Sequence, residues 1–510
     1  MTLVRSAALA LIALAAPLHA ASTAPEVPTY QTFAPPKGLG SDNSGEFNIG
    51  FNPKTGRILA FASANIYRLT PPEKLSPAQQ ETCPALWEDV SPPVVQLEPE
   101  DPILWTDQLS GRTFASNWTQ GAGIEYAFSD DDGTTWIQAG VAPPDGGIDH
   151  ETIGTGPYPA DSPFGAIAAA TGFPNAVYYC SQGAEPAFCQ RSDNGGVSFG
   201  PSVPIYTGVT SDCASLHGHI HVGPDGTAYV PNGGCDSGQG GAMSTDAGLT
   251  WSEFIVPDTI GGGGKGSDPS MAIDKDNTAY FCYANAEVNG GGKARVAVSH
   301  DHGQTWTDDT DIGLPFGIVT AAFPQATVGG DPGRASCGFL GTTTKGDWQA
   351  ATFKGVWYLY IATTYDGGKT WTTVSVDPKD PVQGQGGICL SGLGCSGRNR
   401  NLLDFNETTI DDRGRVLFGY VKGCTGSCIA NPARNPFSAD MRVVRQLGGR
   451  TLFAKYDGDA GAAHPACGST APPAALPSGS SPTLRGGAAG LATLLPLLAG
   501  LLLRRRRAWR

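Results

Sequence analysis

The chain has 510 residues and a formal net charge of −14, with 70 glycines, 40 prolines and only 16% charged residues. So acidic a chain is a poor ligand for nucleic acid or anionic lipid, and both are excluded as partners of the folded part. The glycine and proline content favours a β protein with many turns and little helix.

The first residues have the features of a secretory signal peptide. An early Arg5 precedes a run of Ala and Leu, and small residues surround position 20. We therefore expect residues 1–20 to be removed and the rest to be exported. The next segment, TYQTFAPP at 29–36, is predicted to form a strand that pairs into the last repeat and closes the fold.

Seven stretches then follow in which two apolar strands flank a short turn, with β-branched and aromatic residues alternating. They occupy residues 46–62, 101–118, 162–180, 218–232, 268–284, 323–342 and 406–421. Because each reads as strand, turn, strand, the sequence predicts seven repeats.

Five of the repeats are followed by a copy of the pattern Ser-x-Asp-x-Gly-x-Thr-Trp, in which the second copy has Asn194 for Asp. The copies occupy residues 129–136, 192–199, 244–251, 299–306 and 364–371 and start 63, 52, 55 and 65 residues apart. Asp and Gly favour a tight turn, and the closing aromatic residue can pack beneath it. Recurrence at this spacing indicates units that stack their apolar faces on one another.

These motifs resemble the Asp-boxes, or BNR repeats, of the sialidase-like β-propellers, over roughly residues 40 to 455. With the seven hairpins, the resemblance implies an all-β, seven-bladed β-propeller within residues 21–467. Six blades, the number in true sialidases, is the alternative. In that family the box joins the two outer strands of a blade, away from the active face. The motif specifies a fold better than a function.

True sialidases hold a substrate carboxylate with three arginines, the first of them in an Arg-Ile-Pro motif, and this sequence has no such motif. Arg112 and Arg334 lie at hairpin turns, on the side of the disc that we expect to face away from a site. Only Arg398 and Arg400 precede an inner strand. We therefore expect a propeller that binds or cleaves glycans without being an exo-sialidase. The alternative is a non-catalytic scaffold that binds protein or polysaccharide through loop aromatics such as Trp87, Trp105, Trp348 and Tyr158.

Candidate site residues lie in the polar loops before the innermost strands, at 146–163, 211–221, 261–270 and 397–407. A histidine beside carboxylates can transfer protons near neutral pH, although such residues also satisfy loop backbone groups. The catalytic candidates are His150, Glu151, Tyr158, Asp161 and Arg400. The substrate-binding candidates are Asp149, His217, His219, Asp268, Arg398 and Asp404.

No metal site or cofactor is firmly indicated. The run HGHIH at 217–221 places three imidazoles along one expected strand, but they would spread over about 13 Å, too far for one tetrahedral ion. Structural imidazoles are the favoured interpretation. Acidic turns at 130–132 and 308–311 offer the oxygen ligands that Ca²⁺ takes, and solvated turns explain them equally well.

Twelve cysteines in an exported chain predict disulfides. Short separations favour four pairs, which are Cys180 with Cys189, Cys213 with Cys235, Cys389 with Cys395, and Cys424 with Cys428. For the rest, we pair Cys282 with Cys337 and Cys83 with Cys467.

The C-terminal region has the features of a sorting or anchoring segment. A Pro/Ser/Ala-rich linker at 468–485 precedes Gly-Gly, sixteen apolar residues at 488–503 and an Arg cluster at 504–507. The arrangement resembles the GlyGly-CTERM sorting signals of Gram-negative bacteria, and an uncleaved membrane anchor is the alternative. We expect a monomer at the cell surface or outer membrane, touching the membrane only through 486–510 before processing.

Overall fold

The computed structural model describes residues 27–62, 64–74, 86–92, 101–119, 123–138, 149–183, 186–206, 211–214, 216–261, 266–287, 291–395 and 397–457. All of them belong to one compact unit, Met1–Gly468. The predicted signal peptide, linker and C-terminal segment lie outside the described residues, as do Cys83 and Cys467.

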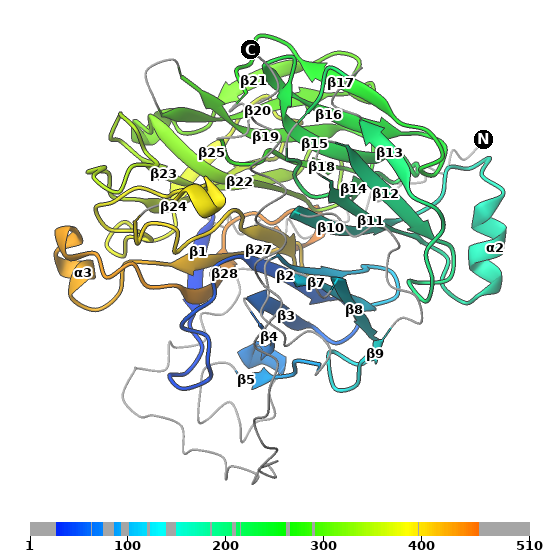
Figure 1. Ribbon diagram of the computed structural model, residues 1–510, viewed down its shortest axis with the longest axis horizontal. Coiled ribbons are helices and arrows are strands. Elements are labelled where there is room, and N and C mark those ends of the chain that lie inside the picture. Colours follow the sequence, from blue (N-terminus) through cyan, green and yellow to red (C-terminus); the bar gives the residue numbers. More distant parts are fainter. Residues whose placement is uncertain are drawn as a thin grey trace, which may run out of the picture. The chain divides into compact units, whose positions relative to one another are not determined.

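The unit is built from antiparallel sheets whose strands follow one another in chain order (Figure 1). The first two sheets are β2 (Phe47–Asn52), β3 (Arg57–Ala62), β4 (Asn65–Thr70) and β5 (Leu86–Asp89), then β6 (Pro102–Thr106), β7 (Thr113–Thr119), β8 (Gly123–Ser129) and β9 (Ile137–Gln138). The next two are β10 (Asp149–Gly156), β11 (Ala176–Gln182), β12 (Ala187–Ser192) and β13 (Val203–Tyr206), then β14 (His221–Val222), β15 (Ala228–Cys235), β16 (Gly238–Ser244) and β17 (Ser252–Val256).

The last four-stranded sheet joins the two ends of the described chain. It contains β26 (Glu407–Ile410), β27 (Val416–Lys422), β28 (Asp440–Gly448) and β1 (Thr29–Phe33). β1 pairs antiparallel with β28, so the predicted closure by the N-terminal segment is confirmed. This pairing joins the two ends of the described chain in one blade, and the short strand β1 is the outer edge of that blade.

The remaining eight strands form one continuous sheet. They are β18 (Ser270–Ile273), β19 (Ala279–Ala286), β20 (Gly292–Ser299), β21 (Thr307–Asp311), β22 (Thr320–Val328), β23 (Ala335–Thr342), β24 (Tyr358–Thr364) and β25 (Thr372–Ser375). β18–β21 and β22–β25 each keep the strand order of the separate sheets, but Gly292 of β20 pairs in parallel with Thr320 of β22. The backbones can meet there because Gly292 has no side chain and Gly291 has a φ of +96°.

The expected count of separate blades, seven or alternatively six, is therefore corrected. The described residues form five separate four-stranded blades and the one eight-stranded sheet. Contacts between first strands run from β2 through β6, β10, β14, β18, β22 and β26 and back to β2. The all-β propeller is thus confirmed, with these strands nearest its axis.

Helix is scarce, as expected, but one helix replaces a predicted strand. Residues 162–180 were expected to form a hairpin, whereas the structure has α2 (Phe164–Ala170) there and uses β10 as the first strand of that blade. The sequence of α2 is FGAIAAA, and alanine favours helix over strand. The other short helical segments within the described ranges are α3 (Ser427–Ala430), η1 (Pro72–Lys74), η3 (Leu314–Phe316), η4 (Gly392–Gly394), η5 (Pro432–Arg434) and η6 (Ala454–Tyr456).

The five repeated motifs form equivalent turns between the third and fourth strands of their blades, at the outer edge. In the third copy, Ser244 Oγ accepts a hydrogen bond from Gly248 N at 2.8 Å, and the Asp246 carboxylate accepts from Thr250 N at 2.9 Å and Thr250 Oγ1 at 2.6 Å. The second copy keeps this arrangement with Asn194, which accepts from Ser198 N at 3.0 Å. The motif is therefore a structural turn far from the ring of inner strands.

The four disulfides predicted from short separations are all present, which indicates an oxidising, extracellular environment. The predicted pairing of Cys282 with Cys337 is wrong, because both are buried free thiols. Burial and the neighbouring Cys337 thiol raise the pKa of Cys282 well above its usual value. The thiolate that disulfide exchange needs is therefore scarce. No helix among the described residues is long and apolar enough to cross a membrane.

Candidate functional site

Acidic residues stand at or just before the start of five inner strands. They are Glu46, Asp101, Asp149, Asp268 and Glu407, at the start of β2, β6, β10, β18 and β26. Because these strands surround the propeller axis and start on the same face, the acidic residues converge there. We call this group, together with His150, Glu151, His219, Arg400 and Asp404, the axial cluster.

A β-bulge at the start of β10 orients His150 in the axial cluster. The register between β10 and β11 shifts between Asp149 and Thr152, and His150 has a φ of +53°. Its backbone N donates to Asp101 Oδ2 at 2.7 Å, and its ring Nδ1 lies 2.8 Å from Asp268 Oδ2. A positive φ in a residue with a side chain costs free energy and is typical of functional positions.

The carboxylates around His150 determine its charge. Burial alone would lower its pKa, but Asp268, followed by Asp149 and Asp101, outweighs burial and raises the pKa well above the usual value. His150 is therefore a cation paired with Asp268 at neutral pH.

Three acidic side chains lie beside this ion pair. The carboxyl of Asp101 lies within hydrogen-bonding reach of those of Asp149 and Glu151. Glu151 is fully buried, and among the described residues no N–H or hydroxyl donates to its carboxyl oxygens. Burial, with Asp101 and Asp149, raises the pKa of Glu151 well above its usual value. Glu151 therefore keeps its proton to a higher pH than an exposed glutamate does.

Asp149 is the member of this trio that solvent can reach. Burial raises its pKa to about 7; the positive charge of His150 opposes this shift, and Asp101 and Asp404 add to it. A carboxyl group that is about half protonated near pH 7 can donate or accept a proton there.

A second carboxyl pair involves Arg400. Both terminal nitrogens of its guanidinium bind the two carboxyl oxygens of Asp404, and one of them also donates to Cys389 O at 3.3 Å. Burial raises the pKa of Glu46 well above its usual value, and Asp101 and Asp404 raise it further against the effect of Arg400. Because Asp404 occupies the guanidinium fork, Arg400 is not free to bind a substrate carboxylate.

The three histidines of the HGHIH run have different environments. His219 Nδ1 lies 2.6 Å from Glu407 Oε2. Burial lowers the pKa of His217 to about 3 and that of His221 to about 4, so both are neutral. The expectation that one strand carries all three is wrong, because β14 begins only at His221. In the part of the chain that the structure describes, no group of three or more His, Cys, Asp or Glu side chains is placed to hold a metal ion.

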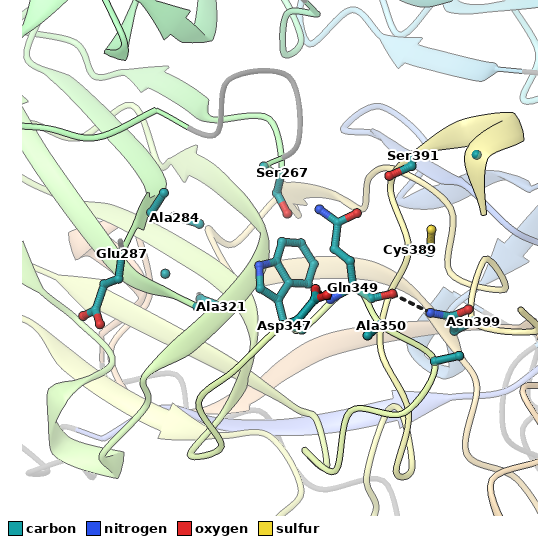
Figure 2. Close-up of a pocket in the computed structure, with 17 residues that line it drawn as sticks. Ser267, Ala284, Glu287, Ala321, Asp347, Gln349, Ala350, Cys389, Ser391 and Asn399 are labelled. Atoms are coloured by element: carbon teal, nitrogen blue, oxygen red, sulfur yellow. Dashed lines mark hydrogen bonds between the residues drawn. The ribbon is translucent and has the colours of Figure 1, made fainter. Parts of the chain in front are cut away.

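A cavity of about 740 Å³ opens beside the axial cluster (Figure 2). Its walls come from the β19–β20 and β23–β24 loops and from the segments before β18 and β26, and they include Trp348. Cys389, which lines the cavity, accepts the hydrogen bond from Arg400, and Ser267 of the lining directly precedes Asp268. The cavity and the cluster therefore share a wall.

The structure brings together eight of the eleven predicted site residues in or beside the axial cluster. One of them, His217, contacts the cluster through its carbonyl oxygen, which lies 3.1 Å from His150 Nδ1. Tyr158 and Asp161 lie elsewhere: Tyr158 donates to Asp193 Oδ1 at 2.7 Å, beside the second repeated motif, and Asp161 is exposed before α2. The sequence was interpreted as one loop over 146–163, but β10 runs through it. At roughly 3.3 Å per residue, the strand carries Tyr158 about 30 Å from Asp149.

Arg398 is also outside the cluster. It is exposed, donates to Pro436 O, and lies over the ring of Phe437. By contrast, sequence reasoning missed Glu46 and Asp101. Their position in the repeat could have identified them, because each directly precedes the first strand of a repeat.

We expect the free energy of unfolding to fall as pH rises from 3.8 through about 7. The pKa of Asp149 is 3.8 without the fold and about 7 in it. A raised pKa means that the folded state retains a proton that the unfolded chain has lost. The resulting stabilisation is complete below pH 3.8 and disappears as pH rises through about 7. The raised pKa of His150 acts in the same direction, its contribution being lost as pH rises through that pKa.

Urea unfolding at a series of pH values measures this effect. Asp149→Asn removes one titrating group and should flatten the curve between pH 3.8 and about pH 7. Wild-type stability that is constant or increases over this range would contradict the charge assignment in the cluster.

No protein family model matches the chain, and no curated protein matches it. A GH74 enzyme of Niastella koreensis is 15% identical, with a TM-score of 0.44, covering 76% of this chain and 52% of that one. A Hadza microbial sialidase is 14% identical, with a TM-score of 0.37 and coverage of 77% and 73%.

A lectin of Aleuria aurantia, in complex with α-methyl-L-fucoside, is 11% identical, with a TM-score of 0.38 and coverage of 67% and 97%. The chain spans about half the length of the GH74 enzyme. Similarity at this level assigns the chain to no family. The class that its own fold and site define is an all-β propeller with a cluster of acidic side chains at its axis, in which the pKa values of Glu46, Asp149 and Glu151 are raised.

Proposed function

We propose that this protein is a glycan-cleaving β-propeller whose reaction takes place at the axial cluster. Glycosidic bond cleavage needs a carboxylic acid to protonate the leaving group and a second, ionised group to stabilise or attack the sugar cation. In this proposal Asp149 is the acid, and Asp404, which Arg400 binds through both oxygens, is the second carboxyl group.

One observation carries the assignment: two partly exposed carboxyl groups, Asp149 at the start of β10 and Asp404 before β26, interact, and their environments differ. Asp404 raises the pKa of Asp149, which reaches about 7, while Arg400 binds both oxygens of Asp404. Environments that separate the protonation states of neighbouring carboxyls are typical of acid and base assignments.

His150 and Glu151, the pair favoured by the sequence, have supporting roles in this proposal. Both are buried, at 7% and 0% exposure, so a substrate touches neither. His150 holds its charge beside Asp149, and Glu151, whose pKa Asp149 helps to raise, is buried two residues away along the chain. They are positioning residues for Asp149.

A glycan panel tests the proposal. Purified protein is incubated near pH 6 with neutral, amino and sialylated oligosaccharides and polysaccharides, and released reducing ends are measured by mass spectrometry. We expect cleavage of at least one neutral glycan and none of the sialylated conjugates. The absence of new reducing ends across the panel would reject the catalytic proposal.

A non-catalytic glycan-binding scaffold is the second candidate function. The ion pairs His150–Asp268, His219–Glu407 and Arg400–Asp404 favour it, because charges already satisfied by protein partners suit a preformed binding surface. Binding of a panel glycan without turnover would establish this function instead.

We also propose that the propeller acts outside the cell. Four disulfides support this placement. The proposed signal peptide and the C-terminal segment would direct the chain to the surface of a Gram-negative cell. Release of the protein into the medium on deletion of 486–510 would support surface attachment.

A further inference from the structure

The cavity beside the axial cluster has the size and position of a ligand subsite. Its volume of about 740 Å³ lies within the range of about 300–1,000 Å³ that is typical of ligand pockets. It opens on the face where the inner strands start, and it shares a wall with the cluster through Cys389 and Ser267.

Trp348 provides an apolar surface in this cavity. It is half-buried, and its ring meets the fully buried Trp357 edge-on at a centroid distance of 6.0 Å, which holds it in place. An indole face supported in this way suits the apolar C–H face of a sugar ring. The residue lies in the long β23–β24 loop between Thr342 and Tyr358, an insertion that builds this side of the cavity.

The polar lining of the cavity suits hydroxyl groups. Figure 2 shows the side chains of Ser267, Glu287, Asp347 and Gln349 around the cavity, with Asn399 donating to Gln349 O at 2.7 Å. Carboxylate and amide oxygens accept hydrogen bonds from hydroxyls, and the Ser267 hydroxyl can donate one.

The charge of the lining disfavours acidic sugars. Its described residues include Glu287 and Asp347 but no Lys or Arg. Lys345 Nζ lies 3.4 Å from Glu287 Oε2, but the side chain of Lys345 is 64% exposed. The neighbouring guanidinium, Arg400, is occupied by Asp404. A sugar carboxylate would therefore meet two carboxylates without an available cationic partner among these residues.

We propose that this cavity binds an uncharged sugar residue stacked on Trp348, as the subsite next to the axial cluster. The identity of the ligand as a glycan rests on the proposed function. In addition, the bound glycan is uncharged and extends from Asp149 and Asp404 over the wall that the cavity shares with the axial cluster. The Trp348 subsite then determines which glycan is held in place for Asp149.

Titration calorimetry with an inactivated protein tests the subsite separately from catalysis. In the Asp149→Asn background, the probes are cellohexaose, mannohexaose, maltohexaose and N-acetylchitohexaose, with sialyllactose as the acidic probe. We expect a neutral hexasaccharide to bind, Trp348→Ala to weaken its binding at least about tenfold, and Trp348→Phe to keep most of the affinity. Sialyllactose should not bind.

Trp371→Ala is the matched control, because this half-buried tryptophan belongs to a repeated turn at the outer edge and donates to Gly368 O. Its removal should leave binding unchanged. Circular dichroism and thermal unfolding confirm that each variant is folded. No binding by any neutral probe, equal binding in Trp348→Ala, or preference for sialyllactose would overturn the subsite.

The two proposals fail in different ways. Trp348-dependent binding without turnover by the wild type rejects the catalytic assignment and keeps the subsite. Cleavage with an unchanged KM in Trp348→Ala rejects the subsite and keeps the catalytic assignment.

Discussion

Replacement of Asp149 by Asn is expected to lower kcat/KM for the cleaved glycan by about 10²–10⁴-fold, the usual contribution of a general acid. The amide keeps the size of the side chain and cannot supply the proton. KM should change little, because the proton matters mainly in the transition state. Initial-rate kinetics on the glycan identified by the panel measure both constants.

The pH profile distinguishes an acid from a merely structural residue. Because the pKa of Asp149 is about 7, wild-type activity should decline as pH rises above that value. Residual activity of Asp149→Asn should lack this decline. Asp161→Asn, an exposed carboxyl on another loop, is the matched control and should keep wild-type rates. Full activity in Asp149→Asn would remove the residue from the mechanism.

Asp404→Asn tests the other half of the pair through the same kinetics. Its loss should lower kcat, and it should also lower the pKa of Asp149, because one of the carboxylates that raises this pKa is gone. The alkaline decline in residual activity should therefore move to lower pH. A profile that keeps its wild-type midpoint would place Asp404 too far away to act with Asp149.

The repeats could be predicted from sequence because their determinants are local. Each repeated turn is closed by hydrogen bonds among residues at most four apart, as between Asp246 and Thr250, so its pattern is visible in the chain. The four disulfides also join nearby residues, the longest span being the 22 residues between Cys213 and Cys235. The two blade-like halves of the eight-stranded sheet are joined by one residue pair, Gly292 with Thr320. The repeat pattern of the sequence does not predict this pair.

The site was predictable only where a loop held several polar residues together. His150, Glu151 and Asp149 were found for that reason, whereas Asp101 stands alone before an apolar strand and binds His150 across 49 residues. Tyr158 was placed in the wrong region because the residues of β10, DHETIGTG, do not show the alternation of apolar and polar residues that predicts a strand. Convergence at an axis is a tertiary property, so position within the repeat is a better guide to it than local polarity.

Replacement of Gly419 by Ala is expected to destabilise the propeller by about 2–3 kcal/mol, within the usual cost of overpacking a core. The affected contact lies between the last blade and the first blade. Gly419 lies in β27, and a Cβ atom there would lie well inside van der Waals distance of the Phe47 ring of β2. Phe47 is fully buried, so its ring has no free space to enter. The clash falls between the first and last blades and directly beside Glu46 of the axial cluster.

Urea unfolding of Gly419→Ala, Phe47→Leu and the double variant measures this clash as a coupling energy. The smaller leucine should relieve part of the clash, so the double variant should be more stable than the sum of the single effects predicts. Gly165→Ala is the matched control: its Cβ would meet Tyr158 only at an ordinary 3.4 Å, and alanine favours helix α2, so stability should stay the same or rise. Wild-type stability in Gly419→Ala would mean that Phe47 does not fill this seam, and the packing that closes the ring would need another explanation.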